Sequence, residues 1–129
     1  MHFLNSLYRI KQKEIEKNSG RAIISLNKEH PIYRGHFPGN PVTPGVCSLE
    51  ILTEFIAVNY PGLPQPAKIE QIKFLNFINP VSDKIIRLEV NFKANEDGSW
   101  RVRGMLGTDK KQAVKLIARY APQASLPHG

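Results

Sequence analysis

The residues best suited to acid–base chemistry lie in a loop rich in proline and glycine and in the apolar segment that follows it. His36 stands in the loop, and Glu50 follows fourteen positions later. Histidine can act as a general base near neutral pH. A carboxyl group among apolar neighbours favours its protonated form, which suits a general acid. His36 and Glu50 are therefore the candidate catalytic pair.

The predicted start of the helix supplies a third candidate, a backbone N–H group. Thr43 is a plausible N-cap, Pro44 suits the first helical position, and Gly45 would be the second helical residue. The first N–H groups of a helix have no partner within it, and the helix dipole adds partial positive charge there. The N–H of Gly45 is therefore a candidate donor to a substrate carbonyl oxygen, and polarising a carbonyl such as that of a thioester makes the neighbouring C–H more acidic.

Two further side chains lie close to Glu50 on the predicted helix. Glu54 is four residues on, so the two carboxyl groups share a face, which favours one protonated acid. Cys47 is interpreted as a packing residue, because no second histidine is placed to activate it. Each group alone admits a structural role: His36 as part of a rigid loop, Glu50 as a paired core charge or a dimer contact. It is their combination that favours catalysis.

The pattern of helix and strands expected from the sequence predicts an α+β domain that positions these groups. We expect one helix, buried because its apolar side chains point almost all round, wrapped by a curved antiparallel sheet. The expected elements are a hairpin from Leu7–Lys17 and Arg21–Leu26 around a turn at 18–20, a loop from Lys28 to Thr43, a helix from about Pro44 to Asn59, and strands at Lys68–Phe77, Lys84–Ala94, Trp100–Gly107 and Ala113–Tyr120.

The size and composition of the chain fit one domain over residues 1–129. Its 129 residues, 41% of them hydrophobic, can form one core, expected at about 5–121, with a flexible tail at 122–129. No apolar run is long enough for a membrane helix, and the first residues lack the apolar stretch of a signal peptide. Cys47 is the only cysteine, which excludes an internal disulfide. We therefore expect a cytoplasmic protein that does not span a membrane.

The charge of the chain is basic, with a formal net charge of +7. Such a surface attracts acidic partners, whether nucleic acid, anionic lipid or an acidic protein. The basic residues are spread along the sequence, no helix presents a basic face, and no zinc-ligand spacing occurs. These observations argue against a nucleic-acid-binding protein.

The loop and helix start also resemble a known signature. The resemblance rests on Gly35, His36, Phe37, Pro38, Pro41, Pro44 and Gly45, with the acid at Glu50. This pattern, without gaps, is similar to that of the FabZ/FabA-type 3-hydroxyacyl-[acyl-carrier-protein] dehydratases of fatty-acid synthesis. Residues 7–10 and 73–83 resemble further stretches of the family, so the resemblance covers about residues 5–120.

The resemblance implies a hot-dog fold and a homodimer, or a higher even oligomer, with active sites at the subunit interface. His36 of one protomer would take the α proton of a 3-hydroxyacyl thioester, and Glu50 of the other would protonate the departing hydroxyl. Gly45 N–H would hold the thioester carbonyl, with Phe37, Pro44 and Glu54 as accessory residues. The acyl chain would arrive on the phosphopantetheine of an acyl carrier protein. No metal or cofactor is required.

The chain departs from the family pattern at Glu54, where the family has a glutamine that helps to position the acid. This departure, with the polar Thr43 and Cys47-Ser48, hints at polyketide- or polyene-like lipid synthesis. Two alternatives remain open. One is a hot-dog thioesterase, in which Glu54 beside Glu50 activates water. The other is a non-catalytic acyl-binding subunit of the same fold.

Overall fold

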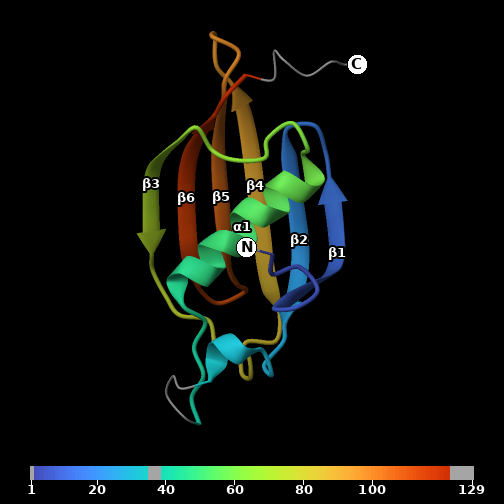
Figure 1. The fold of residues 1–129 in the computed structure, drawn as a ribbon, viewed down its shortest axis with the longest axis vertical. Helices are drawn as coiled ribbons and strands as arrows, with labels where there is room; N and C mark the ends of the chain where they lie inside the picture. Colours follow the sequence, from blue (N-terminus) through green and yellow to red (C-terminus); the bar gives the residue numbers. More distant parts are fainter. Residues whose placement is uncertain (1, 35–38, 123–129) are drawn as a thin grey trace.

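The computed structural model describes residues 2–34 and 39–122. The sequence signature at 35–38, which includes His36 and Phe37, and the tail at 123–129 lie outside the described residues. The elements in chain order are β1 (Tyr8–Ile15), β2 (Ser19–Leu26), the 3-10 helix η1 (Pro31–Tyr33), α1 (Gly45–Asn59), β3 (Lys68–Phe74), β4 (Ile86–Ala94), β5 (Trp100–Thr108) and β6 (Gln112–Tyr120) (Figure 1).

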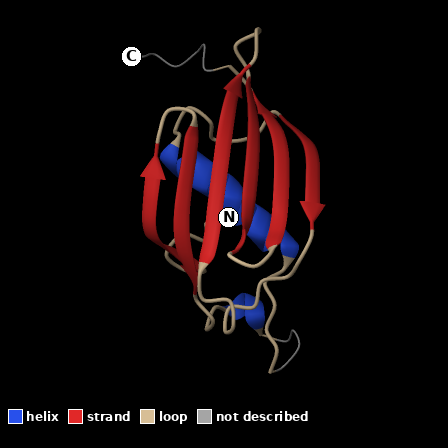
Figure 2. Cartoon of the chain, turned by 180° about the vertical axis from the view of Figure 1, so that it is seen from behind, coloured by secondary structure: helices blue, strands red, loops and turns tan. Residues whose placement is uncertain are grey.

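The strands form one six-stranded sheet in the order β1-β2-β4-β5-β6-β3, with every pair antiparallel. The sheet curves around α1, which lies across its inner face (Figures 1 and 2). This is the hot-dog fold, and the expectation of one helix wrapped by a curved antiparallel sheet is confirmed.

The position of β3 differs from the expected succession of neighbouring strands. β3 pairs with β6 at the edge of the sheet rather than with β4, while β4 pairs with β2. The segment between β3 and β4 therefore crosses the end of the sheet instead of closing a hairpin. The sequence also gave no sign of η1, a single turn inside the expected loop, which is capped by the side chain of His30.

Helix α1 is buried on the side that faces the sheet. Ile51, Leu52 and Phe55 are fully buried there, and Gly104 of β5 leaves room for Leu52, whose Cδ2 would lie 3.3 Å from a Cβ at that position. The expectation that the helix is buried all round is wrong for the single chain, because Val46 is 68% exposed. Val58, near the C-terminal end of the helix, is also 49% exposed.

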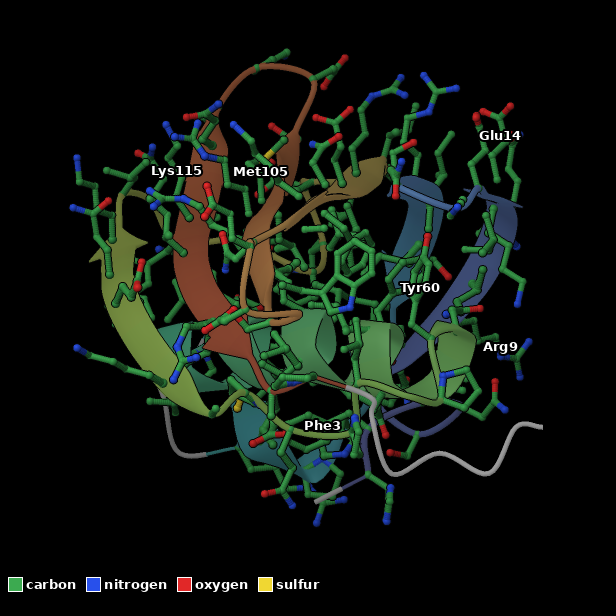
Figure 3. The ribbon with its side chains drawn as sticks, turned by 90° about the horizontal axis from the view of Figure 1, so that it is seen from above. Phe3, Arg9, Glu14, Tyr60, Met105 and Lys115 are labelled. Atoms are coloured by element: carbon green, nitrogen blue, oxygen red, sulfur yellow. The ribbon has the colours of Figure 1, made fainter. Side chains whose placement is uncertain are left out.

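The C-terminal end of α1 is fixed to the β1–β2 hairpin by Tyr60. Its hydroxyl donates to the backbone oxygens of Glu16 (3.0 Å) and Ser19 (2.8 Å), and its ring packs against Phe92 with centroids 4.4 Å apart. Figure 3 shows Tyr60 between the helix and these strands. The helix that carries Glu50 is therefore held at this end as well as along its buried face.

Candidate active site

The N-terminal end of α1 begins one residue later than the sequence predicts. Pro44, with extended backbone angles, is the N-cap, and Gly45 is the first helical residue rather than the second. Thr43 is not the cap, because its hydroxyl is 2.9 Å from the hydroxyl of Tyr33 and its N–H donates to the backbone oxygen of Ile78. No side chain caps the helix.

Thr43 instead connects the start of α1 to two other segments. Its hydrogen bond to Tyr33 reaches η1, and its backbone bridge to Ile78 reaches the segment after β3. Asn79 adds a second link to this segment by donating to Asn40 Oδ1 at 3.0 Å. Burial is the main reason why the pKa of Tyr33 rises to about 12, so the hydroxyl stays protonated. These contacts hold Pro44 and Gly45 in place.

Gly45 presents a backbone N–H at the open end of the helix. Among the described residues, no acceptor for this N–H is found. The ring of Phe74, which is 54% exposed, covers one side of the glycine, since a Cβ on Gly45 would lie 2.7 Å from Phe74 Cδ1 and 2.9 Å from Cε1. A hydrogen-bond donor in this position can stabilise negative charge on a carbonyl oxygen.

Glu50 lies on α1 five positions after Gly45 and is half-buried. No described residue donates a hydrogen bond to its carboxyl group. Cys47 lies close enough for the two to interact, because burial and then the charge of Glu50 raise the pKa of the Cys47 thiol. A protonated, partly buried thiol packs rather than attacks, which agrees with the interpretation of Cys47 as a packing residue. The structure thus places Gly45 and Glu50 on one helix.

Glu54 has surroundings quite different from those of Glu50. Its side chain is 8% exposed, and its oxygens accept hydrogen bonds from the N–H groups of Phe3 and Leu4 and from the hydroxyl of Tyr8. Burial, followed by the charge of Glu54 and the hydrogen bond to it, raises the pKa of Tyr8. Sequence reasoning missed this arrangement, because the donors lie about fifty residues away in the chain.

Basic side chains that are spread along the sequence gather on the outer face of the sheet, which we define as the face away from α1. The cations on β3 to β6 that lie on this face are Lys68, Lys73, Arg87, Lys93, Arg101, Arg103, Lys115 and Arg119. Lys73 stands directly opposite Lys115, and Figure 3 shows Lys115 on the outer side of the arch. Like charges opposite each other on a sheet are unfavourable, so this face can attract an acidic partner.

Exposed apolar side chains occur on α1, on β3 and in the segment that follows β3, and one of them, Phe74, lies beside Gly45. They belong to Val46 on α1, to Ile69 and Phe74 on β3, and to Leu75, Phe77, Val81 and Ile85 after it. Phe77, for example, is 63% exposed. β3 is an edge strand, so both its side chains and one row of its backbone groups are open to a partner.

Residues 2–34 and 39–122 contain neither a candidate metal site nor a candidate membrane-spanning helix. No three His, Cys, Asp or Glu side chains in these ranges are grouped so as to hold a metal ion. No helix within them has the length and apolar character needed to cross a membrane.

Comparison with known protein families gives one match that covers most of the chain. The ApeI-like family, described as ApeI dehydratase, matches residues 11–115. Two relatives are named 3-hydroxyacyl-[acyl-carrier-protein] dehydratase FabZ. The one from Fusobacterium nucleatum is 34% identical over 84 residues, or 61% of this chain and 58% of that protein. The one from Erwinia tasmaniensis is 32% identical over 111 residues, 77% of this chain and 72% of that protein.

The match thus spans less than two thirds of the Fusobacterium relative. Among solved structures, the dehydratase heterocomplex ApeI:P from Xenorhabdus doucetiae is similar over 88% of this chain and 97% of that chain, with a TM-score of 0.65 and 20% identity. A protein from Erwinia carotovora subsp. atroseptica gives a TM-score of 0.58 with 21% identity, over 90% of this chain and 93% of the other. These structures share the fold described above.

Proposed function

The chain belongs to the ApeI-like dehydratase family, and from this premise we propose that it removes water from 3-hydroxyacyl thioesters to give trans-2-enoyl thioesters. The observation that carries the proposal is the N-terminal end of α1, where Gly45 offers an N–H and Glu50 a half-buried carboxyl group that accepts no hydrogen bond from the residues that the structure describes. The relatives' names point to the same reaction class.

The reaction needs a base, an acid and a group that binds the carbonyl oxygen. His36 takes a proton from the α carbon of the substrate, and the electrons move toward the thioester carbonyl, whose oxygen is held by the N–H of Gly45. The bond between the β carbon and its hydroxyl oxygen then breaks. Glu50 supplies the proton that lets this oxygen leave as water, and the remaining electrons form the double bond.

The proposed active form of the enzyme is a homodimer or a higher even oligomer. In it, His36 and Glu50 of one site come from different protomers. The apolar side chains beside the site support it, because a second copy would cover them. Phe74 touches Gly45, and Thr43 is bonded to Ile78, so this surface and the start of α1 are adjacent. Pairing of two β3 edges would bring the two helix starts to one interface.

The proposed substrate carrier is an acyl carrier protein with its phosphopantetheine-linked acyl chain, in fatty-acid or polyketide/polyene-like lipid synthesis in the cytoplasm. The net charge of +7 supports an acidic carrier. The hollows on the outer face of the sheet are lined by residues such as Arg103 and Lys115 and contain neither Gly45 nor Glu50. They are therefore separate from the proposed site of the chemistry.

The thioesterase alternative is weakened by the surroundings of Glu54. That alternative needs a second carboxylate that can hold a water molecule beside Glu50. The oxygens of Glu54 are buried and already accept hydrogen bonds from three protein donors. Glu54 is therefore a poor base for a water molecule.

Incubation of the purified protein with 3-hydroxyacyl-carrier-protein and with trans-2-enoyl-carrier-protein of several chain lengths, followed by mass spectrometry, tests the proposal. We expect interconversion of the two, seen as loss or gain of one water, and its disappearance in His36→Ala and Glu50→Gln. Release of free acid would make the protein a thioesterase. No change with any acyl chain would point to an acyl-binding subunit.

A further inference from the structure

We propose that Glu54 is a positioning residue, which anchors the N-terminal turn (residues 2–8) to α1 and through it holds the helix that carries Glu50 in place against the segment that leads to His36 of the same protomer. The inference rests on the proposed function for the role of Glu50 and His36. The anchor itself rests on contacts among described residues and is independent of that function.

The carboxylate of Glu54 accepts hydrogen bonds from several residues of the N-terminal turn. Its Oε1 accepts from Leu4 N at 2.9 Å, Phe3 N at 3.1 Å and Tyr8 Oη at 2.9 Å, while Oε2 lies 3.2 Å from Phe3 N and 3.4 Å from His2 Nδ1. Figures 1 and 3 show the N-terminal end on the side of α1 away from the sheet. The turn is therefore held against the helix by hydrogen bonds to one side chain.

The same turn also contacts residues 27–30, which precede His36 in the chain. The ring of Phe3 packs edge-on against His30, with centroids 5.8 Å apart, and the backbone oxygen of Leu7 accepts from Asn27 N at 2.7 Å. His30 in turn caps η1 through its Nδ1, which accepts from Ile32 N. Contacts thus run from Glu54 on the helix, through Phe3, to η1 just before residues 35–38.

η1 returns to the start of α1 through Tyr33, whose hydroxyl is bonded to Thr43. The N-terminal turn consequently fixes, within each protomer, the helix that carries Glu50 relative to the segment that leads into His36. Because each protomer of the proposed dimer gives Glu50 to one site and His36 to the other, the turn bears on the geometry of both sites. A misplacement of about 1 Å at a reacting group can lower the rate by about a hundredfold, so loosening this turn is expected to impair the sites to which the protomer contributes.

A carboxylate suits these donors better than the side-chain amide of the glutamine that is usual at this position in the FabZ/FabA-type dehydratases. An ionised carboxylate only accepts hydrogen bonds, and both of its oxygens can do so, whereas an amide offers one oxygen and a nitrogen that only donates. In Glu54→Gln, either orientation of the amide directs an NH₂ group at Phe3 N or at the group of three donors. The departure at Glu54 is thus explained by the N-terminal turn that it holds.

The direct test compares amide exchange by NMR in the full chain, in Glu54→Gln and in Glu50→Gln. The two substitutions make the same chemical change one turn apart on α1. In Glu54→Gln we expect the N–H groups of Phe3 and Leu4 to exchange at least about tenfold faster. In Glu50→Gln their exchange is expected to stay as in the parent. Unchanged exchange in a folded Glu54→Gln protein would overturn the anchor.

The positioning role is tested by the turnover of 3-hydroxyacyl-carrier-protein over a range of pH. Glu54→Gln should lower kcat by about ten- to a hundredfold with little change in KM, and the pH profile should keep its shape. Loss of the acidic limb of the profile would instead make Glu54 an acid in the reaction. Parent-like kcat despite faster amide exchange would show that the anchor positions nothing.

A second variant covers the case in which Glu54→Gln does not fold. If Glu54→Gln does not fold, Tyr8→Phe removes only one of the donors, and we expect it to speed Phe3 and Leu4 exchange and lower kcat by smaller factors in the same direction. An unaffected Tyr8→Phe protein would then overturn the proposal. If the parent itself turns over no acyl thioester, the proposed function fails, whereas the exchange comparison still decides whether Glu54 is the anchor.

Discussion

At the scale of single residues, the two glutamates of α1 show how far side-chain chemistry can be inferred from sequence. Spacing alone placed Glu50 and Glu54 on neighbouring parts of one helix and suggested that they act together. The structure separates their surroundings, because Glu54 is buried against Phe3, Leu4 and Tyr8 while Glu50 has no described donor. The partners of Glu54 are 46 to 51 positions away, a distance over which sequence pattern carries no information about contact.

Thr43 and Tyr33 offer a test of how the start of α1 is held. Thr43→Val removes a hydroxyl but keeps the shape, and leaves the buried Tyr33 hydroxyl without its partner. We expect a loss of about 1–3 kcal/mol in the free energy of unfolding, measured with urea. Thr43→Val combined with Tyr33→Phe removes both partners and should lose less than Thr43→Val alone. A larger loss in the double variant would show that the pair does not act through this hydrogen bond.

A side chain at Gly45 is expected to displace the ring of Phe74, a contact that the sequence did not reveal. In Gly45→Ala, the new Cβ would lie 2.7 Å from the ring of Phe74, so the ring or the helix start must shift. We expect a loss of about 1–3 kcal/mol in stability, together with a lower kcat. In combination with Phe74→Ala, the cost of Gly45→Ala should largely vanish in a double-mutant cycle. Fully additive costs would contradict the contact.

At the scale of elements, local signals predicted most of the structure. The hairpin, the helix and the β4–β5–β6 meander follow from alternation of apolar residues and from turn residues. The position of β3 could not be derived in this way, because pairing with β6 joins residues 40 to 51 positions apart. The start of α1 was misplaced by one residue, since Thr43 is engaged by Tyr33 and Ile78 instead of capping the helix.

The edge formed by β3 and the segment after it carries the proposed contact between copies. Phe77→Glu would place a charge on this apolar surface, where Phe77 is 63% exposed. We expect the dimer to dissociate in sedimentation velocity and activity to fall with it, because each site would lose one of its two residues. Val58→Glu, an exposed apolar position near the other end of α1, is the control and should leave assembly unchanged. Dissociation by both or by neither would place the contact elsewhere.

At the scale of the whole molecule, the curved sheet makes two faces with separate properties. Its inner face holds the core and α1, and its outer face gathers cations from β3 to β6. The net charge can be counted from the sequence, but this distribution cannot, because strand order decides which charges become neighbours. Lys73 and Lys115, opposite each other across the sheet, are 42 positions apart in the chain.

The buried tyrosines predict how stability depends on pH. Burial raises the pKa of Tyr33 and of Tyr120 to about 12, from 10.0 when unfolded. Below pH 10 both states hold these protons; between about pH 10 and 12 only the unfolded state releases them, so unfolding becomes easier. We expect each tyrosine to cost up to about 3 kcal/mol of stability over this window.

Urea unfolding at pH 8 and at pH 11 measures this effect. Tyr33→Phe should lose less stability between the two pH values than the parent, since it removes one of the groups that titrate differently in the two states. An equal loss in the parent and in the variant would show that Tyr33 ionises as readily in the folded protein as in the unfolded chain.

The measurement that tests the central claim most directly is to mix His36→Ala with Glu50→Gln, let the subunits exchange, and assay dehydration of a 3-hydroxyacyl-carrier-protein. Each variant alone should be inactive. If His36 and Glu50 of one site come from different protomers, half of the mixed dimers' sites are intact, and about a quarter of the parent activity should return. Inactivity of the mixture after exchange has been verified, or undiminished activity of either variant alone, would contradict the account.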